Sequence, residues 1–431
     1  MLKKIKSHLP FIYISLFYIS LIFFDNDINS KVILIGLLLS LILFNKEKTK
    51  KTICDNYPLL ILFFLIIFSL TYTINIDYGL KKVERLLIIP AAILMASSLG
   101  KIRFKVIALV FIIISLIATL YSHSIVLIEF LANNETSYKH FFNLNYSYKA
   151  LANTINLHPT YYSLYILTAL VFITFFLEKK TTSLFVKIIL TIVFIYFSVF
   201  LVQLSSRMAI GALYLVIVFN IIKHIVNRKK IIRGLLILVL FHSIAFLVIM
   251  NIGVTKYRFQ HLLGFTYYTG YTVNDGNHKI NLWTAAINAN DNIIIGNGIG
   301  DVQESLNEQY LKRGLNKELK EEYNSHNQYI QYYVGLGFVG VFFFLYTLIY
   351  FSKKFITNKN LIALQFLLIV YLMSFTECLW ERHNGIVFIT FTLLLLSKCD
   401  YKEEKLFTDE ESCTLLKVKA DSITNSNKNL V

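Results

Sequence analysis

A histidine stands where a polar part of the sequence becomes apolar. His326 and Asn327 close the polar stretch, and residues 328–350 continue without a charged residue into a strongly apolar run. An imidazole titrates near neutral pH, so it can accept a proton from a hydroxyl group under physiological conditions. At the edge of a membrane helix such a group is costly unless it is hydrated or paired. His326 is therefore a candidate general base; the alternative is an interfacial histidine that simply stays in contact with water.

The composition indicates that a membrane protein must position this histidine. The chain has 431 residues, of which 56% are hydrophobic and 16% are charged, with a mean hydropathy of +0.60. The net charge of +16 lies mostly in short loops between apolar runs, so it indicates membrane topology and not a nucleic-acid partner. The four cysteines have no CxxC spacing, so neither a zinc site nor a disulfide framework is expected.

Apolar runs divide the chain into about 12 expected membrane spans and predict an all-α, polytopic fold. One membrane domain is expected over residues 1–397, with a long polar loop at 251–325 between the ninth and tenth spans and a charged cytoplasmic tail at 398–431. Residues 124–131 are a candidate interfacial helix, and residues 301–323 are expected to form one amphipathic helix over the site. The spans are expected at about 9–24, 31–44, 58–72, 83–98, 106–121, 158–177, 184–202, 208–226, 234–250, 331–351, 361–375 and 385–396.

The basic loops orient these spans. Loops at 46–51, 101–105, 179–180, 223–233 and 353–359 are rich in Lys and Arg, and they all fall on one side if the Lys-rich N-terminus is cytoplasmic. Both termini are then cytoplasmic, whereas Arg207, His326, the loop at 251–325 and the turn at 377–384 share the opposite face. ATP and nucleotide sugars are absent from that face. An enzyme acting there needs a donor that is already activated and is delivered by the membrane.

Several short motifs together resemble the bacterial O-antigen ligase and O-antigen polymerase (Wzy-like) superfamily of membrane glycosyltransferases. The resemblance covers about residues 80–396, and its main motif is a histidine at the end of a large periplasmic loop. The motifs are His326-Asn327 followed by Gly337 and Gly340, Trp283 in Asn-Leu-Trp-Thr-Ala-Ala, Gly296-Asn-Gly-Ile-Gly300, Ser205-Ser-Arg207, and Pro90 in the fourth span.

The resemblance implies a ligase-type glycosyltransferase in the bacterial inner (cytoplasmic) membrane, with its active face in the periplasm. Its partners would be a glycan on undecaprenyl diphosphate, an acceptor hydroxyl on lipid A-core, and membrane lipid. Direct displacement would invert the anomeric centre, and neither a metal nor another cofactor is expected. The alternative is a polymerase, whose acceptor is another lipid-linked repeat unit of the growing polysaccharide. A protein O-oligosaccharyltransferase is a further variant, and a polysaccharide transporter is disfavoured because no internal repeat is visible.

The resemblance also implies roles for individual residues. His326 would act as the base, and Arg207 at a helix N-terminus would neutralise the leaving diphosphate. The family commonly places a second Arg four residues before the Trp, where this chain has Lys279, with His278 beside it and Arg258 further upstream. Lysine neutralises phosphate as a point charge but lacks the bidentate fork of arginine. Any of these three residues is a candidate for the second cation, and Arg207 has the alternative role of a lipid-headgroup anchor.

Further candidates surround the expected site. The cluster Lys81, Lys82 and Arg85 is the one basic group that violates the cytoplasmic rule, and it is either a supplement to the diphosphate site or a tolerated interfacial cluster. His158 enters the sixth span from the outer face, so it either lines the cavity or only starts a helix at Pro159. Asn327, beside the histidine, is a further candidate for contacting the substrate.

The turn before the last span carries three more charges. Glu377, Glu381 and Arg382 are expected to pair among themselves at the outer rim, with Glu377 the best placed of them to reach the site. Gly337 and Gly340 are expected to serve close helix packing and not catalysis.

Overall fold

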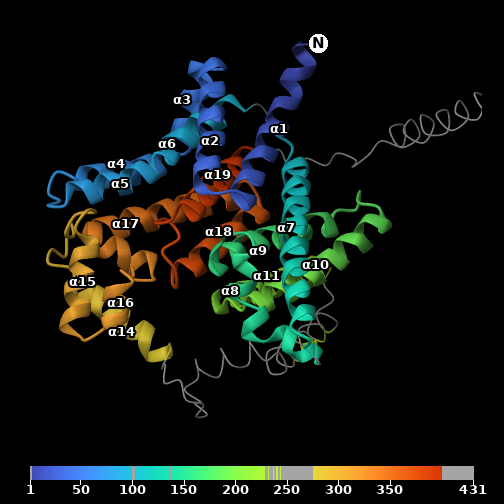
Figure 1. The fold of residues 1–431 in the computed structure, drawn as a ribbon. Helices are drawn as coiled ribbons and strands as arrows, with labels where there is room; N and C mark the ends of the chain where they lie inside the picture. Colours follow the sequence, from blue (N-terminus) through green and yellow to red (C-terminus); the bar gives the residue numbers. More distant parts are fainter. Residues whose placement is uncertain are drawn as a thin grey trace, which may run out of the picture.

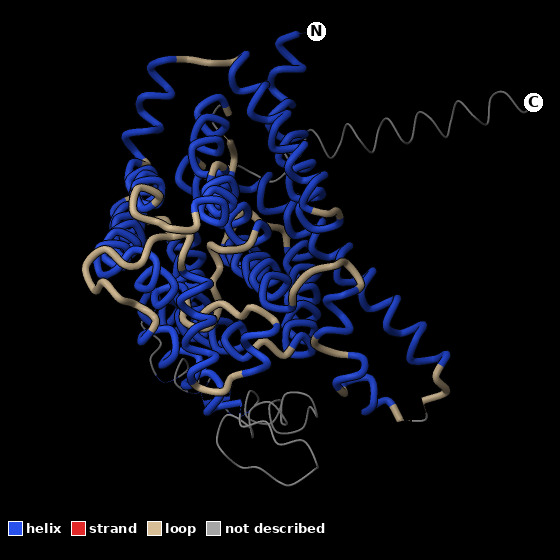
Figure 2. Tube along the Cα trace, turned by 60° about the vertical axis from the view of Figure 1, so that its left-hand side comes forward, coloured by secondary structure: helices blue, strands red, loops and turns tan. Residues whose placement is uncertain are grey.

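The computed structural model describes residues 2–99, 102–135, 137–228 and 275–399, with single positions between 232 and 243. Throughout these residues the fold is helical, and no strand is present in them (Figures 1 and 2). The ninth expected span, the start of the loop at 251–325 and nearly all of the tail lie outside the described residues. The helices are α1 (Leu2–Phe23), α2 (Asn26–Ile42), α3 (Lys46–Asp55), α4 (Tyr57–Ser69), α5 (Ile76–Leu86), α6 (Ile88–Ser98), α7 (Phe104–Ala132), η1 (Tyr138–Phe142), η2 (Leu144–Tyr146), α8 (Lys149–Asn153), α9 (Pro159–Glu178), α10 (Leu184–Leu204), α11 (Arg207–Arg228), α14 (Asp275–Asn288), α15 (Val302–Lys312), α16 (Asn316–Lys320), α17 (Gln328–Thr357), α18 (Leu361–Ser374) and α19 (His383–Lys398).

Four of the described helices are long and apolar enough to cross a membrane, namely α7, α9, α10 and α17. A fifth span results if α3 and α4, which meet at a bend of 77°, are counted together. Residues 9–23 of α1, together with α18 and α19, are shorter apolar helices. This composition is that of an integral membrane protein. The count of about 12 crossings and their orientation stay predictions.

Three expected elements differ from the observed ones. Residues 124–131 form no separate interfacial helix, because α7 continues through them for 29 residues and ends at Asn133. The expected fourth span is broken into α5 and α6, and Pro90 explains the break: it has no N–H to donate to the carbonyl of Leu86, where α5 ends. The expected helix at 301–323 is two helices, because Gly314 adopts a φ of +67° directly after the C-cap of α15.

Helix α17 is interrupted at Gly337, whose backbone is non-helical at φ 62° and ψ −158°. An interruption in a membrane helix frees backbone groups that hydrocarbon cannot satisfy. Here the loop at residues 293–298 satisfies them, so the two glycine motifs of the sequence bond to each other. The bonds run from Asn297 N to Val334 O (2.9 Å), from Gly298 N to Gly335 O (3.0 Å), from Phe338 N to Ile293 O (2.9 Å) and from Val339 N to Ile294 O (3.1 Å).

Replacing Gly337 with Ala should destabilise the protein by about 2 kcal/mol or more. A Cβ atom at Gly337 would lie 2.3 Å from the carbonyl carbon and oxygen of Ile294, and its φ is unfavourable for any L-residue. Thermal unfolding of the purified protein in detergent measures the effect. Gly211→Ala is the matched control: a Cβ there meets nothing within 4 Å, and alanine should stabilise α11 slightly. Equal unfolding temperatures for Gly337→Ala and wild type would contradict this role.

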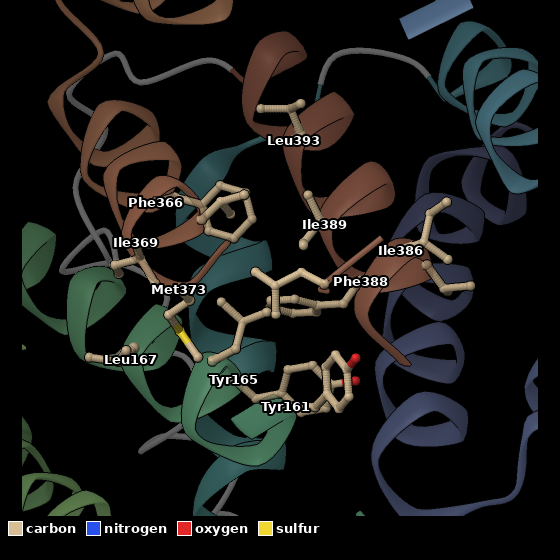
Figure 3. Close-up of a cluster of buried hydrophobic side chains, with 14 of the residues drawn as sticks. Tyr161, Tyr165, Leu167, Phe366, Ile369, Met373, Ile386, Phe388, Ile389 and Leu393 are labelled. Carbon is tan, nitrogen blue, oxygen red and sulfur yellow. The ribbon is translucent and has the colours of Figure 1, made fainter. Parts of the chain in front are cut away.

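The core that supports the outer loops lies between α9, α18 and α19. Figure 3 shows Tyr161 and Tyr165 of α9 against Phe388 of α19, and all three rings are buried. The Tyr165 hydroxyl donates to Asn384 O at 2.8 Å, and the Tyr161 hydroxyl donates to Cys378 O at 3.4 Å. The start of α9 is therefore tied to the turn between α18 and α19. Both of these segments carry side chains of the candidate site.

Candidate functional site

One cavity of about 230 Å³ collects residues from six separate parts of the chain. Its lining includes His326 and Arg207, the two residues on which the interpretation of the sequence depends most. It also includes Lys279, His158 and Glu377. The side chains thus come from the turn before α17, the start of α11, helix α14, the start of α9 and the turn after α18. The lining is completed by Tyr148, Thr160, Ser206, Met208, Leu282 and Thr376.

A tight turn holds His326 at the entrance to α17. Its backbone is left-handed, with φ at +47°, and its N–H donates to the side-chain oxygen of Asn324 at 3.0 Å. Asn327 follows as the N-cap of α17 and accepts the N–H groups of Tyr329 and Ile330 at 3.0 and 3.2 Å. Asn327 does not line the cavity, so its position is explained by helix capping. The imidazole of His326 is about a quarter exposed and meets the ring of Tyr323 edge-on.

The carboxylate of Glu377 is the partner of the His326 imidazole. His326 Nδ1 lies 3.5 Å from Glu377 Oε1, and the glutamate side chain is only 7% exposed. Burial by itself raises the pKa of Glu377, but the contact with His326 and the electrostatic effects of His158 and Arg382 outweigh it and lower that pKa to about 2. The carboxylate is therefore ionised throughout the physiological pH range.

His158 lines the same cavity as the N-cap of α9. Its Nδ1 accepts the backbone N–H of Thr160 at 3.3 Å, so in the neutral form the proton resides on Nε2. Burial lowers the pKa of His158, and the nearby Glu377 only partly opposes this effect. A neutral imidazole with a free N–H is a hydrogen-bond donor for an oxygen-rich ligand.

Two cations line the cavity from different elements. Arg207 begins α11 two residues after Ser205, whose left-handed backbone (φ 51°) ends α10. Lys279 extends from α14 and donates to the backbone oxygen of Thr376 at 3.5 Å, next to Glu377. The positive end of the α11 helix dipole adds its field to that of Arg207. The cavity thus has donors suited to an anion beside a histidine–carboxylate pair.

The basic cluster on α5 has a different position from the one expected. None of Lys81, Lys82 and Arg85 is among the residues that line the cavity. Lys82 forms an ion pair with Glu381, and Arg85 Nη1 donates to the backbone oxygen of Glu381 at 3.4 Å. Burial acts to lower the pKa of Lys82, but the Glu381 carboxylate outweighs it and raises that pKa.

These contacts correct the expected pairing within the turn after α18. Glu377 and Glu381 are both buried and face different partners, instead of pairing with Arg382 at an exposed rim. A buried carboxylate requires a cation, which explains why Lys82 of α5 lies against Glu381.

Two further predicted residues cannot be placed in the cavity. Arg258 lies outside the described residues. His278 precedes Lys279 in α14, but its side chain is also outside the part of the structure that is described. Among the described residues, no group of three or more His, Cys, Asp or Glu side chains is placed to hold a metal ion.

Tyr148 was not predicted and lines the cavity beside His158. Its backbone is left-handed, with φ at 54°, and its N–H donates to the carbonyl of Gln203 at 3.0 Å, near the end of α10. The only signal in the sequence was the abundance of aromatic residues in the polar stretch at 133–156. That signal does not single out one tyrosine.

Comparison with known proteins gives one match. No curated protein matches the chain. The family model described as Wzy_C, O-Antigen ligase, matches residues 192–345. That region includes six residues of the cavity lining, among them Arg207, Lys279 and His326, whereas His158 and Glu377 lie outside it. The match confirms the resemblance drawn from the motifs: residues 192–345 are similar to the domain described as O-Antigen ligase.

Proposed function

We propose that this protein is a glycosyltransferase that moves a glycan from undecaprenyl diphosphate to an acceptor hydroxyl on lipid A-core. The reaction would take place at the periplasmic face of the bacterial cytoplasmic membrane. One observation carries the proposal: a single cavity brings a histidine–carboxylate pair together with Arg207 and Lys279. The O-antigen ligase domain at 192–345 supports the reaction class.

The histidine–carboxylate pair supplies the base. With Nδ1 of His326 facing the Glu377 carboxylate, Nε2 is the nitrogen that can accept the proton of the acceptor hydroxyl. The imidazolium formed in this step would be stabilised by the ionised carboxylate beside it. The acceptor oxygen then attacks the anomeric carbon as the bond from that carbon to the diphosphate oxygen breaks. One such displacement inverts the anomeric centre.

The cations stabilise the leaving group. Negative charge grows on the diphosphate as the glycosidic bond breaks, and fixed positive groups lower the free energy of that transition state. Arg207 can bind two phosphate oxygens through its planar fork, whereas Lys279 provides a point charge. His158 can donate a hydrogen bond from Nε2 to a sugar or phosphate oxygen without adding charge.

Genetic complementation should separate the ligase from the polymerase. Expression in a strain that lacks its O-antigen ligase should restore long glycans on lipid A-core, visible as a ladder in lipopolysaccharide gels. The same gene in a strain that lacks the polymerase should not restore chain extension. The opposite pair of results would identify the protein as a polymerase and overturn the acceptor assignment. The His326→Ala gene serves as the negative control in both strains.

The low pKa of Glu377 predicts a pH-dependent contribution to stability. A buried group whose pKa falls from 4.5 to about 2 on folding contributes about 3 kcal/mol above pH 4.5, and this contribution is lost as the pH falls through 2. Glu377→Gln should therefore unfold at a lower temperature than wild type at pH 7, and the difference should shrink below pH 4.5. Thermal unfolding in detergent across this pH range measures it.

Glu308→Gln is the control for that measurement. Glu308 is exposed and pairs with the equally exposed Lys312, four residues further along α15, so its removal should change stability little at any pH. A difference between wild type and Glu377→Gln that stays constant with pH would show that the carboxylate charge is not what stabilises the fold.

A further inference from the structure

A second cavity, of about 520 Å³, lies where α2, α5, α6 and α19 meet. Its wall is apolar and includes Leu34 and Leu37 of α2 and Ile88 and Ala91 of α6. Leu34 is 54% exposed although it is a large apolar side chain in an apolar helix, and so this side of the cavity opens at an apolar surface of the protein. The cavity shares no lining residue with the candidate active site.

The other end of this cavity is polar and carries both signs of charge. Glu84 and Arg85 are consecutive residues at the end of α5, both exposed, and both line the cavity with His383. Arg85 is fixed by the bond from its Nη1 to the carbonyl of Glu381, and a guanidinium has further N–H donors to offer. His383 Nε2 bonds to the side-chain oxygen of the buried Asn29 at 2.8 Å, which leaves Nδ1 as an acceptor in the neutral form.

This arrangement has the chemistry of a lipid headgroup site. Arg85 can donate to phosphate oxygens, whereas Glu84 and His383 can accept from an ammonium group. A site for an anion alone would not place the Glu84 carboxylate beside Arg85, because the carboxylate would repel the bound anion. The apolar wall then continues from the polar end along α2 and α6, where an acyl chain can pack.

We infer that the second cavity binds a zwitterionic glycerophospholipid with a primary amine, of the phosphatidylethanolamine class. The phosphate contacts Arg85, the ammonium group contacts Glu84, and an acyl chain lies against Leu34 and Ala91. A choline headgroup lacks the N–H donors of this ammonium group, and a glycerol headgroup lacks the positive charge. The inference rests on the cavity alone and does not depend on the proposed glycosyl transfer.

The site also has a structural link to the first cavity. The turn between α18 and α19 carries Glu377 into the first cavity and presents Glu381 to Lys82 and Arg85. A phospholipid on Arg85 therefore contacts a residue that holds this turn. Bound lipid would therefore help to hold the turn that carries Glu377.

Native mass spectrometry of the full-length protein in detergent tests the inference. Phosphatidylethanolamine, phosphatidylglycerol and phosphatidylcholine with identical acyl chains are added separately. The wild type should retain phosphatidylethanolamine about tenfold more strongly than either other lipid, as expected for one charged hydrogen bond. Arg85→Gln should lose this retention, and Glu84→Gln should lose the preference over phosphatidylglycerol. Lys31→Gln removes one positive charge from α2 outside the cavity lining, and it should bind as wild type does.

A second variant separates lost binding from lost folding. Ala91→Phe fills the apolar wall and leaves the bond between Arg85 and Glu381 in place, so it should lose lipid retention while its unfolding temperature stays close to that of wild type. Equal retention of the three lipids by wild type overturns the inference. So does undiminished phosphatidylethanolamine binding by Arg85→Gln or Ala91→Phe. Stronger binding of phosphatidylglycerol than of phosphatidylethanolamine overturns the headgroup assignment.

Discussion

Replacing His326 with Ala should lower glycan transfer by about a hundred- to ten-thousand-fold, the usual range for loss of a general base. The reason is geometric: no other imidazole in the cavity has the same relation to a carboxylate. His158 also lines the cavity, but its Nδ1 accepts a backbone N–H, so it cannot form the same pair with Glu377. Single-turnover transfer from a purified lipid-linked donor measures the chemical step without a contribution from product release.

The backbone at His326 requires a second variant. At a φ of +47°, alanine is strained, so His326→Ala could lose activity through local unfolding. Asparagine tolerates this conformation and cannot act as a base at neutral pH, so His326→Asn should fold normally and transfer as slowly as His326→Ala. His140→Ala is the positive control, because that histidine is half-exposed, pairs with Glu135 and is not part of the cavity lining. Normal turnover by His326→Asn would remove His326 from the role of base.

The position of His326 could be predicted because it depends on a local feature. The change from polar to apolar residues around position 326 places a histidine at the start of a helix, and Asn327 caps that helix in the structure. Likewise, Ser205 and Arg207 are close in the sequence, so a break between helices that begins α11 at Arg207 follows from local conformation. Features of this kind can be predicted from the sequence because they depend on only a few consecutive residues.

The partner of His326 could not be predicted in the same way. The sequence places Glu377, Glu381 and Arg382 in one turn, and nothing local decides which side of the turn each side chain faces. Packing decides it: Tyr161 of α9 bonds to the backbone oxygen of Cys378 in this turn, and Tyr165 bonds to that of Asn384 at the start of α19, so the turn has a fixed orientation over α9. Glu377 then faces the first cavity, whereas Glu381 faces α5.

The glycine motifs show a similar limit. Close packing was predicted for Gly337, and the structure shows a more specific role, since the loop at 293–298 bonds to the interrupted helix there. The sequence marks Gly296 and Gly337 separately, but an interruption of a membrane helix is tolerated only if both segments supply each other's backbone partners. A Cβ atom at Gly296 would lie 2.4 Å from the backbone nitrogen of Leu336, so the glycines on both sides are required. Only the folded arrangement shows this reciprocity.

Replacing Arg207 with Lys should lower transfer by about ten- to a hundred-fold, although the charge is kept. A lysine ammonium group cannot bind two oxygens of one phosphate through a planar fork, and its shorter reach displaces the charge from the leaving group. Arg207→Gln should lower transfer further, because it removes one of the two cations, Arg207 and Lys279, that line the cavity. The measured quantity is kcat/KM for the lipid-linked donor, compared with Arg313→Lys, an exposed arginine after α15.

Product inhibition distinguishes a diphosphate contact from a structural role for Arg207. Undecaprenyl diphosphate carries the group that Arg207 is proposed to bind, so it should inhibit Arg207→Lys more weakly than it inhibits wild type. If Arg207 is instead a lipid-headgroup anchor, its loss would reduce the amount of folded protein. Inhibition of the remaining folded enzyme by undecaprenyl diphosphate would then be the same as in wild type. The ratio of the two inhibition constants does not depend on enzyme concentration. Unchanged inhibition together with reduced turnover would therefore move the diphosphate away from Arg207 and leave Lys279, on α14, as the cation to test next.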